Sequence, residues 1–300
     1  MDPIRTKRVP WRSWSDFTGW AQDFSLRQKV LGGFLGVVVL VGLIASLIGT
    51  RLARETIINT ARVRLHSQLA SASYVLRSAQ QNVDMKIRLM ANSERFAAAV
   101  ERGDVQEAQN RLAILAVEND LDFLSLTDDK GRTEAKAFVQ EVKTNNEAAS
   151  DAVIIAALKG TSASGVRLVP LQRLVHENPS LSQRLGTVDN KMGMVFESAY
   201  PLKLNDKIVG SVYGGIVLNN SGVTDRISQL LFKGEKHAGK DLGSITIYLG
   251  NEAISTTLKG PNGLPLFGSP PDSKIFEMVL NKGLKETTWV TQVGTTYLAA

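Results

Sequence analysis

The longest unbroken run of apolar residues lies near the start of the chain, over residues 30–50, VLGGFLGVVVLVGLIASLIGT. It contains no charged residue, and apolar side chains would lie on every side of a helix formed from it. Roughly 20 such residues cover the hydrocarbon core of a bilayer. We therefore expect a transmembrane helix over residues 30–50. The alternative is a buried helix in a large soluble core, but such helices rarely run this long without a polar face.

Aromatic residues recur every three or four positions before this run, and three of the four Trp residues of the chain are among them. The spacing predicts a short amphipathic helix at the lipid–water interface, a place where Trp is favoured. The predicted membrane-interface residues, in contact with lipid, are Trp11, Trp14 and Trp20. The alternative is a disordered tail with scattered aromatic residues.

A cleaved signal peptide would have a shorter apolar core, roughly 7–15 residues, behind a brief charged leader. Here the leader is longer, so we expect an uncleaved anchor. Lys and Arg mark the cytoplasmic side, and more of them follow the apolar run (Arg51, Arg54, Arg62 and Arg64) than closely precede it. Long domains nevertheless cross membranes largely regardless of charge. We therefore place residues 1–29 in the cytoplasm as a tail and the main domain outside a bacterial inner membrane.

A helical stalk is predicted after the apolar run. From Arg51 to Asn92 there is no Pro or Gly, and apolar or small residues recur at steps of three or four, which predicts one long helix with a single apolar stripe. We expect one part of the stripe to pair with a second copy of the chain, giving a homodimer, and the rest to pack on the carried domain. The alternative is packing within one chain only. Asp104 and Glu107 resemble a capping box that opens a further helix, so residues 51–119 are predicted as stalk and packing helices.

Two groups of short β-rich segments follow, at residues 120–220 and 240–300, joined by a predicted linking helix over residues 221–239. The residue pattern of each group predicts the order strand, turn, strand, loop, helix, strand, strand. Residues 170–191 are polar and predict a loop-like insertion. In the second group the last strand of the unit is missing, which predicts that these residues are the front portion of a longer protein. The expected fold class is α+β.

Composition and motifs exclude several functions. The net charge is +6, but half of the excess lies before residue 30, which argues against a basic nucleic-acid-binding face on the folded part. The chain has no Cys and only three His, none with a partner at metal-ligand spacing. It lacks the glycine-rich nucleotide loops and the nucleophile elbow. We therefore predict no active site, no metal and no cofactor in these residues.

Several fragments resemble one family, the double Cache sensory region of bacterial transmembrane receptors. They are FSLRQKVLGGFLG, LDFLSLTDDKGR, AYPLKLNDKIVGSVYGGIVLNN, SITIYLGNEAISTTL and TTWVTQVGTTYLAA. The resemblance covers nearly everything after Val30, and within the family it is closest to histidine kinases. It implies two tandem PAS-like modules, each a five-stranded antiparallel sheet with flanking helices, the first membrane-distal and the second membrane-proximal. It also implies, after residue 300, a further strand, a second membrane helix and a cytoplasmic output module.

A small-molecule pocket is the remaining candidate site. In a PAS-like module it would lie on one face of the sheet, under the loop and helix between the second and third strands. Strand alternation and charge suggest the ligand-binding residues Ser125, Glu134, Arg167, Ser198, Tyr200 and Tyr213, with the two tyrosines as hydrogen-bonding walls. The alternative is that these tyrosines are ordinary core aromatics. The amino-acid-sensing members of the family carry an Arg-x-Trp-Tyr motif before an Asp, and this sequence lacks it.

The sequence therefore predicts the extracytoplasmic ligand-sensing region of a signalling receptor, most like a two-component sensor histidine kinase. Chemoreceptors and diguanylate cyclases share such a front end, and the residues after 300 would separate these classes. A stand-alone single-pass ligand-binding protein is the alternative of a different kind.

Overall fold

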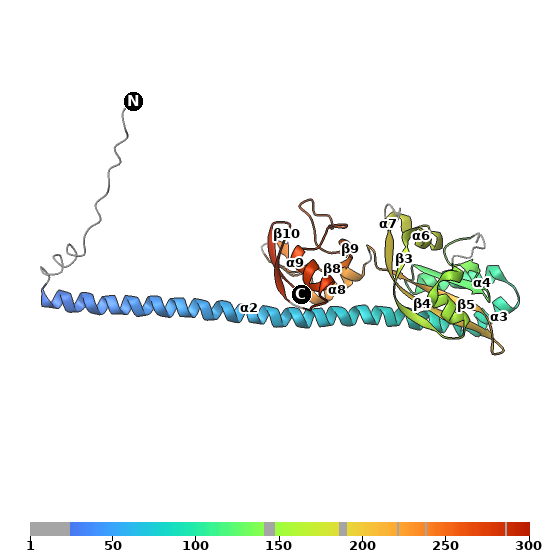
Figure 1. Cartoon of the computed structure of the whole chain (residues 1–300), viewed down its shortest axis with the longest axis horizontal. Coiled ribbons are helices and arrows are strands. Elements are labelled where there is room, and N and C mark those ends of the chain that lie inside the picture. The colour runs from blue at the N-terminus through green and yellow to red at the C-terminus, as the bar shows by residue number, and fades with distance from the viewer. Residues whose placement is uncertain (1–24, 141–147, 186–190, 221, 238, 286) are drawn as a thin grey trace, which may run out of the picture. The chain divides into compact units, whose positions relative to one another are not determined.

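The computed structural model describes residues 25–140, 148–185, 191–220, 222–237, 239–285 and 287–300. The predicted interfacial helix, with Trp11, Trp14 and Trp20, lies outside the described residues. The chain divides into two units, residues 1–64 and residues 65–300. Figure 1 shows the whole chain, with the helices and strands labelled.

One helix, α2 (Leu26–Ala91), contains both the predicted transmembrane segment and the predicted stalk. Among the described residues it is the one helix that is long and apolar enough to cross a membrane. Every residue from Val30 to Thr50 is exposed, so the alternative of a buried core helix does not fit this stretch.

The unit of residues 65–300 contains a five-stranded antiparallel sheet. Its strands are β1 (Phe123–Asp128), β2 (Thr133–Lys136), β3 (Ala163–Pro170), β4 (Met192–Leu204) and β5 (Lys207–Val217). Their order is β2-β1-β5-β4-β3, so the last strand in the sequence is central. Asn205 and Asp206 join β4 to β5, both with positive φ (49° and 63°), as a two-residue hairpin of type I′ requires.

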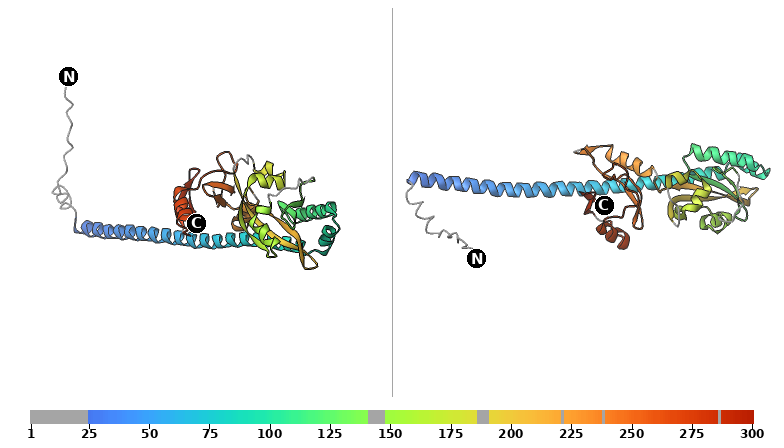
Figure 2. Two further views of the ribbon diagram at one scale, coloured as in Figure 1. Left: turned by 45° about the vertical axis from the view of Figure 1, so that its right-hand side comes forward. Right: turned by 90° about the horizontal axis from the view of Figure 1, so that it is seen from above.

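One face of the sheet packs on helices that precede it in the sequence. The C-terminal part of α2, with α3 (Glu94–Glu101) and α4 (Val105–Glu118), forms an apolar core with the alternate strand residues that point this way. The buried members include Ile87, Phe96, Leu112, Leu124, Phe196 and Val212. Asp104 caps α4 by accepting a hydrogen bond from the Glu107 backbone N–H at 3.0 Å, at the predicted capping position. Figure 2 shows these elements from two further directions.

The opposite face is covered by the segment between β2 and β4. It forms a short 3₁₀ turn (Ala148–Ser150), α5 (Ala152–Leu158), α6 (Leu171–Glu177) and α7 (Leu181–Leu185). The loop predicted over residues 170–191 is therefore wrong in part, because α6 and α7 lie within it. Their apolar side chains, Leu171 and Leu174 on α6 and Leu181 on α7, are buried in a second core with Phe123 and Tyr213.

The second group of strands follows α8 (Val223–Phe232), which is followed by a small hairpin of β6 (Lys236–His237) and β7 (Lys240–Asp241). Helix α8 lies within the predicted linking segment, residues 221–239. Lys233 follows α8 in the left-handed conformation, with φ 51°, which ends a helix. The remaining elements come in the predicted order: β8 (Thr246–Leu249), β9 (Glu252–Thr256), α9 (Ser273–Ile275) with a π-helical turn (Phe276–Asn281), β10 (Thr288–Gln292) and β11 (Thr295–Ala299).

These later strands form two separate hairpins, β8–β9 and β10–β11, and not one sheet. The first sheet supplies a physical reason. There β5 lies between β1 and β4 and hydrogen-bonds both of them. In the second group, no strand of the described residues lies between the two hairpins to join them. The α+β class is thus present as a long helix, a five-stranded sheet and small sheets.

The sheet supplies a matched pair of glycine substitutions. Gly165 and Gly215 are the two cross-strand neighbours of Glu197, on β3 and β5. A Cβ atom at 215 would overlap the backbone carbonyl oxygen of Phe196, whereas a Cβ atom at 165 would meet nothing within 4 Å. We expect Gly215→Ala to destabilise the sheet by about 1–3 kcal/mol and Gly165→Ala to be neutral within about 1 kcal/mol. Thermal melting followed by circular dichroism measures both, and equal melting temperatures for the two variants would contradict this packing.

Candidate functional site

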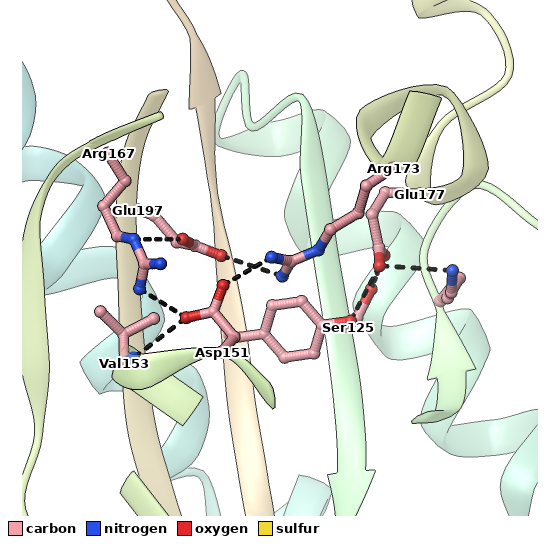
Figure 3. A network of polar contacts seen from close by, with 9 residues as sticks. Ser125, Asp151, Val153, Arg167, Arg173, Glu177 and Glu197 are labelled. Carbon is pink, nitrogen blue, oxygen red and sulfur yellow. Dashed lines mark hydrogen bonds and ion pairs between the residues drawn. The ribbon is translucent and has the colours of Figure 1, made fainter. Parts of the chain in front are cut away.

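A network of buried charges lies between the first sheet and the segment α5–α7 (Figure 3). It contains three acids and three bases, with a serine and a tyrosine that hydrogen-bond to one of the acids. Five strands and two helices contribute its members: Ser125 from β1, Lys136 from β2, Arg167 from β3, Glu197 from β4, Tyr213 from β5, Asp151 from the N-terminus of α5, and Arg173 and Glu177 from α6.

Four of these side chains form a closed ring. The Asp151 carboxylate lies 2.5 Å from Arg167 Nη1 and 2.5 Å from Arg173 Nη1. The Glu197 carboxylate faces the same two guanidinium groups at longer range, 3.4 Å from Arg173 Nη2 and 3.6 Å from Arg167 Nε. Asp151 also accepts a hydrogen bond from the Val153 backbone N–H, which caps α5. Asp151 is therefore tightly paired, and Glu197 is loosely paired.

A second cluster centres on Glu177. Its carboxylate accepts hydrogen bonds from Ser125 Oγ at 2.6 Å and from the Tyr213 hydroxyl at 2.9 Å, and it pairs with Lys136 Nζ at 3.3 Å. The guanidinium of Arg173 lies 6.0 Å from the centre of the Tyr213 ring, at the limit of a cation–π contact. Arg173 and Glu177 are four residues apart on α6, so one helical turn joins the ring to the second cluster.

Burial sets the protonation behaviour of the ring. The side chain of Glu197 has 0 % exposure. Its burial, with the nearby charge of Asp151, raises its pKa from 4.5 to about 7, although Arg173 and Arg167 oppose the rise. Burial lowers the pKa of Arg173, but the charge of Glu197 and the hydrogen bond to Asp151 outweigh that effect and raise it. Glu197 Oε2 has no hydrogen-bond partner among the described residues.

The structure brings together three of the six sequence-predicted ligand residues, because Ser125, Arg167 and Tyr213 all belong to the network. Tyr213 is also fully buried, as the core-aromatic alternative requires. Burial and the neighbouring Glu177 carboxylate raise the pKa of its hydroxyl well above the usual value. All three side chains lie on the face of the sheet under α5–α7.

The other three predicted residues lie elsewhere. Ser198 and Tyr200 point to the opposite face, where both hydroxyls donate hydrogen bonds to Asp84 on α2. Glu134 is exposed on β2 and lines an open hollow of about 560 Å³ with Asn205 and Lys207. The six residues therefore do not surround one pocket.

Sequence reasoning missed Asp151, Arg173, Glu177, Glu197 and Lys136. The signal for Glu197 was available, because it is a charged residue within the apolar run MVFESAYPL of a strand with both neighbours buried. Arg173 and Glu177 were hidden by the loop prediction for their segment, since the i,i+4 spacing carries meaning only on a helix.

Neither of the two best-formed hollows in the described residues lies at the charged network. One is the hollow beside Glu134, and the other, of about 600 Å³, is lined by Asp122, Arg184 and Arg226 among others. Neither is lined by a member of the charged network. In the part of the chain that the structure describes, no group of three His, Cys, Asp or Glu side chains is arranged to hold a metal ion.

Comparison with known proteins gives structural likeness only. No protein-family model matches the sequence, and no curated protein matches it. The chain is similar in structure to sensor domains of bacterial receptors. One is the extracellular domain of the putative histidine kinase vpHK1S-Z8, at 12% identity and TM-score 0.49, covering 78% of this chain and 82% of that one.

Two further similar structures come from other receptor classes. A domain of a putative sensory box/GGDEF family protein from Vibrio parahaemolyticus has 12% identity and TM-score 0.46, over 76% of this chain and 84% of that one. The ligand-binding domain of the Campylobacter jejuni chemoreceptor Tlp3, solved with 4-methylisoleucine, has 13% identity and TM-score 0.43, over 78% of this chain and 86% of that one.

The raised pKa of Glu197 makes a prediction about stability. Between pH 4.5 and about pH 7 the folded chain holds a proton that the unfolded chain releases. The stabilisation from this group is therefore complete below pH 4.5 and is lost as the pH rises to about 7, by roughly 3 kcal/mol in total. We expect Glu197→Gln to remove this part of the pH dependence. Urea unfolding across this range measures it, with Glu101→Gln, an exposed carboxylate on α3, as the control.

Arg173 is one of two bases that pair with both Asp151 and Glu197, so its removal leaves two buried carboxylates with one guanidinium between them. We expect Arg173→Met to cost about 3–5 kcal/mol of unfolding free energy. The control is Lys259→Met, which removes a half-exposed ion pair with Asp241 and is expected to cost less than about 1 kcal/mol. If the two costs, measured by denaturant unfolding, were the same, the Arg173 pairs would not be stabilising this segment.

Proposed function

We propose that this chain is the extracytoplasmic sensory region of a membrane signalling receptor, most like a two-component sensor histidine kinase. One observation carries the proposal. A single helix, α2, contains a fully exposed apolar stretch of bilayer length and ends in the packed core of an α+β unit. An exposed apolar surface of this extent is not stable in water, and lipid is the partner that covers it.

In this proposal residues 1–29 lie in the cytoplasm and the sheet-containing unit lies outside the cell. The absence of Cys is compatible with that side but does not require it. The two strand groups, residues 120–220 and 240–300, act as membrane-distal and membrane-proximal PAS-like modules. The order of elements in the second group, β8, β9, α9, β10 and β11, supports this assignment.

The ligand-responsive site in this proposal is the charged network. Asp151, Arg173 and Glu177 belong to the covering segment, whereas Lys136, Arg167 and Glu197 belong to the sheet. A small molecule with charged groups that replaced any of these ion pairs would change how the segment is held on the sheet. Such a ligand shifts a receptor between two states only by its difference in affinity for them.

We also propose a homodimer formed through the stalk. α2 carries large apolar side chains that nothing in the described chain covers, among them Ile57 at 68 %, Val63 at 70 % and Tyr74 at 74 % exposure. A second copy of the same helix supplies a matching surface. An output module after residue 300 would complete the receptor, with an H-box and nucleotide-binding module in a kinase or a long helical hairpin in a chemoreceptor.

Reporter fusions test the placement of the domain. Alkaline phosphatase folds only outside the cytoplasm, so a fusion after Gly260, within the loop that follows β9, is expected to be active. The same fusion with residues 30–50 deleted is the control, and it should be inactive because the anchor is missing. An inactive fusion after Gly260 together with an active β-galactosidase fusion at the same site would place the sheet in the cytoplasm and refute the proposal.

A further inference from the structure

Strand β4 presents two different polar groups on its two faces. Glu197 points into the charged ring under α5–α7, whereas its neighbours Ser198 and Tyr200 on the strand hydrogen-bond to α2 on the other face. Successive residues of a strand point to opposite faces, so one peptide bond separates the ring from the contact with the helix. A displacement of β4 at Glu197 therefore reaches that contact directly.

Charged or titratable groups face Glu197 from every element packed against it. They are Asp151 on α5, Arg167 on β3, and Arg173 and Glu177 on α6. Lys136 on β2 and Tyr213 on β5 contact Glu177. Among the three acids, Asp151 and Glu177 have close partners at 2.5–3.3 Å, and Glu197 has contacts of 3.4 and 3.6 Å only. Glu197 is thus the acid whose negative charge is least compensated.

A proton needs no cavity to bind at this site. Neither of the two best-formed hollows reaches the ring, and Glu197 Oε2 is buried with no hydrogen-bond partner in the described chain. Protonation removes a buried charge, and it leaves Arg167 and Arg173 paired with Asp151. Burial and the Asp151 charge place the pKa of Glu197 at about 7, within the range of ordinary environments.

On the other face the contact with α2 is polar within an apolar interface. Asp84 accepts a hydrogen bond from Ser198 Oγ at 2.6 Å and from the Tyr200 hydroxyl at 2.9 Å. It is the one acid in residues 56–91 of the sequence, and its neighbours Val83 and Ile87 are buried in the apolar core. Apolar contacts tolerate small sliding, whereas two hydrogen bonds to one carboxylate fix the position of the helix against β4.

We propose that Glu197 is a proton-binding site and that its protonation is transmitted through β4 to α2 by the hydrogen bonds of Ser198 and Tyr200 to Asp84. The proton comes from solvent and binds to a carboxylate oxygen, and no other bond changes. This inference deepens the proposed sensory function and rests on it, because it names the proton as a signal at the same network.

The distance between α2 and the sheet tests the proposal in the full chain in lipid nanodiscs. The chain has no Cys, so Gln81→Cys on α2 and Lys203→Cys on β4, both exposed, place two spin labels at chosen positions. We expect the distance distribution to change between about pH 6 and about pH 8, with a midpoint near the pKa of Glu197.

Three variants separate the steps. Glu197→Gln should make the distribution independent of pH. Asp84→Asn should also abolish the change in distance. It should leave the pH dependence of stability unchanged, because Glu197 is still present. Glu101→Gln, the exposed control, should behave as the parent chain does. If Glu197→Gln does not fold, Arg167→Gln provides a second test. It removes a cation that faces Glu197, so it should raise the pH midpoint of the distance change by about one unit or more.

Each opposite result overturns a stated part of the proposal. A distance change that persists in Glu197→Gln means that another group binds the proton. A change that persists in Asp84→Asn means that Asp84 does not transmit it, and no change in the parent chain means that β4 and α2 are not coupled. None of these results affects the reporter fusions, so failure of the proton site is distinguishable from failure of the extracytoplasmic placement.

Discussion

The pairing of buried charges between the sheet and the segment α5–α7 determines how this segment is held. Removing a carboxylate or guanidinium from water costs several kcal/mol unless a partner is in place, and six such groups meet here. Asp151 at the start of α5 and Arg173 with Glu177 on α6 all need partners on the strands. The two short helices therefore cannot slide or rotate on the sheet without leaving a charge unpaired.

The two faces of the sheet are held to their covering helices by different kinds of interaction. On the face toward α2, α3 and α4 the contacts are mainly apolar and non-directional, and their stability depends on buried area and packing. On the face toward α5–α7 the contacts are ionic and directional, and they depend on protonation and on the positions of single atoms. Strand β4 takes part in both. A chemical change on the ionic face is thus next to a mechanical contact on the apolar face.

Much of the architecture follows from local sequence patterns. The apolar and small residues that recur after Arg51 predicted the buried face of α2, and Asp104 with Glu107 marked the start of α4. The ionic site could not be obtained in the same way, because its members are spread over residues 125–213 and meet only after the sheet has formed. Strand alternation placed Ser125 and Tyr213 on one face, but it could not show that Ser198 and Tyr200 lie on the other. That assignment requires the register between β4 and β5, in which Tyr213 lies opposite Ala199.

The strand order has a consequence for how the domain is made. The central strand of the sheet is β5, and its residue Gly215 lies opposite Phe123 on β1. The hairpin of β1 and β2 can therefore pair with β5 only after most of the domain has been synthesised. Contacts this distant in sequence slow folding. During synthesis the β1–β2 hairpin and the buried arginines can reach their final neighbours only at a late stage. The nascent chain should therefore stay largely unfolded until β5 emerges and then close in one cooperative step.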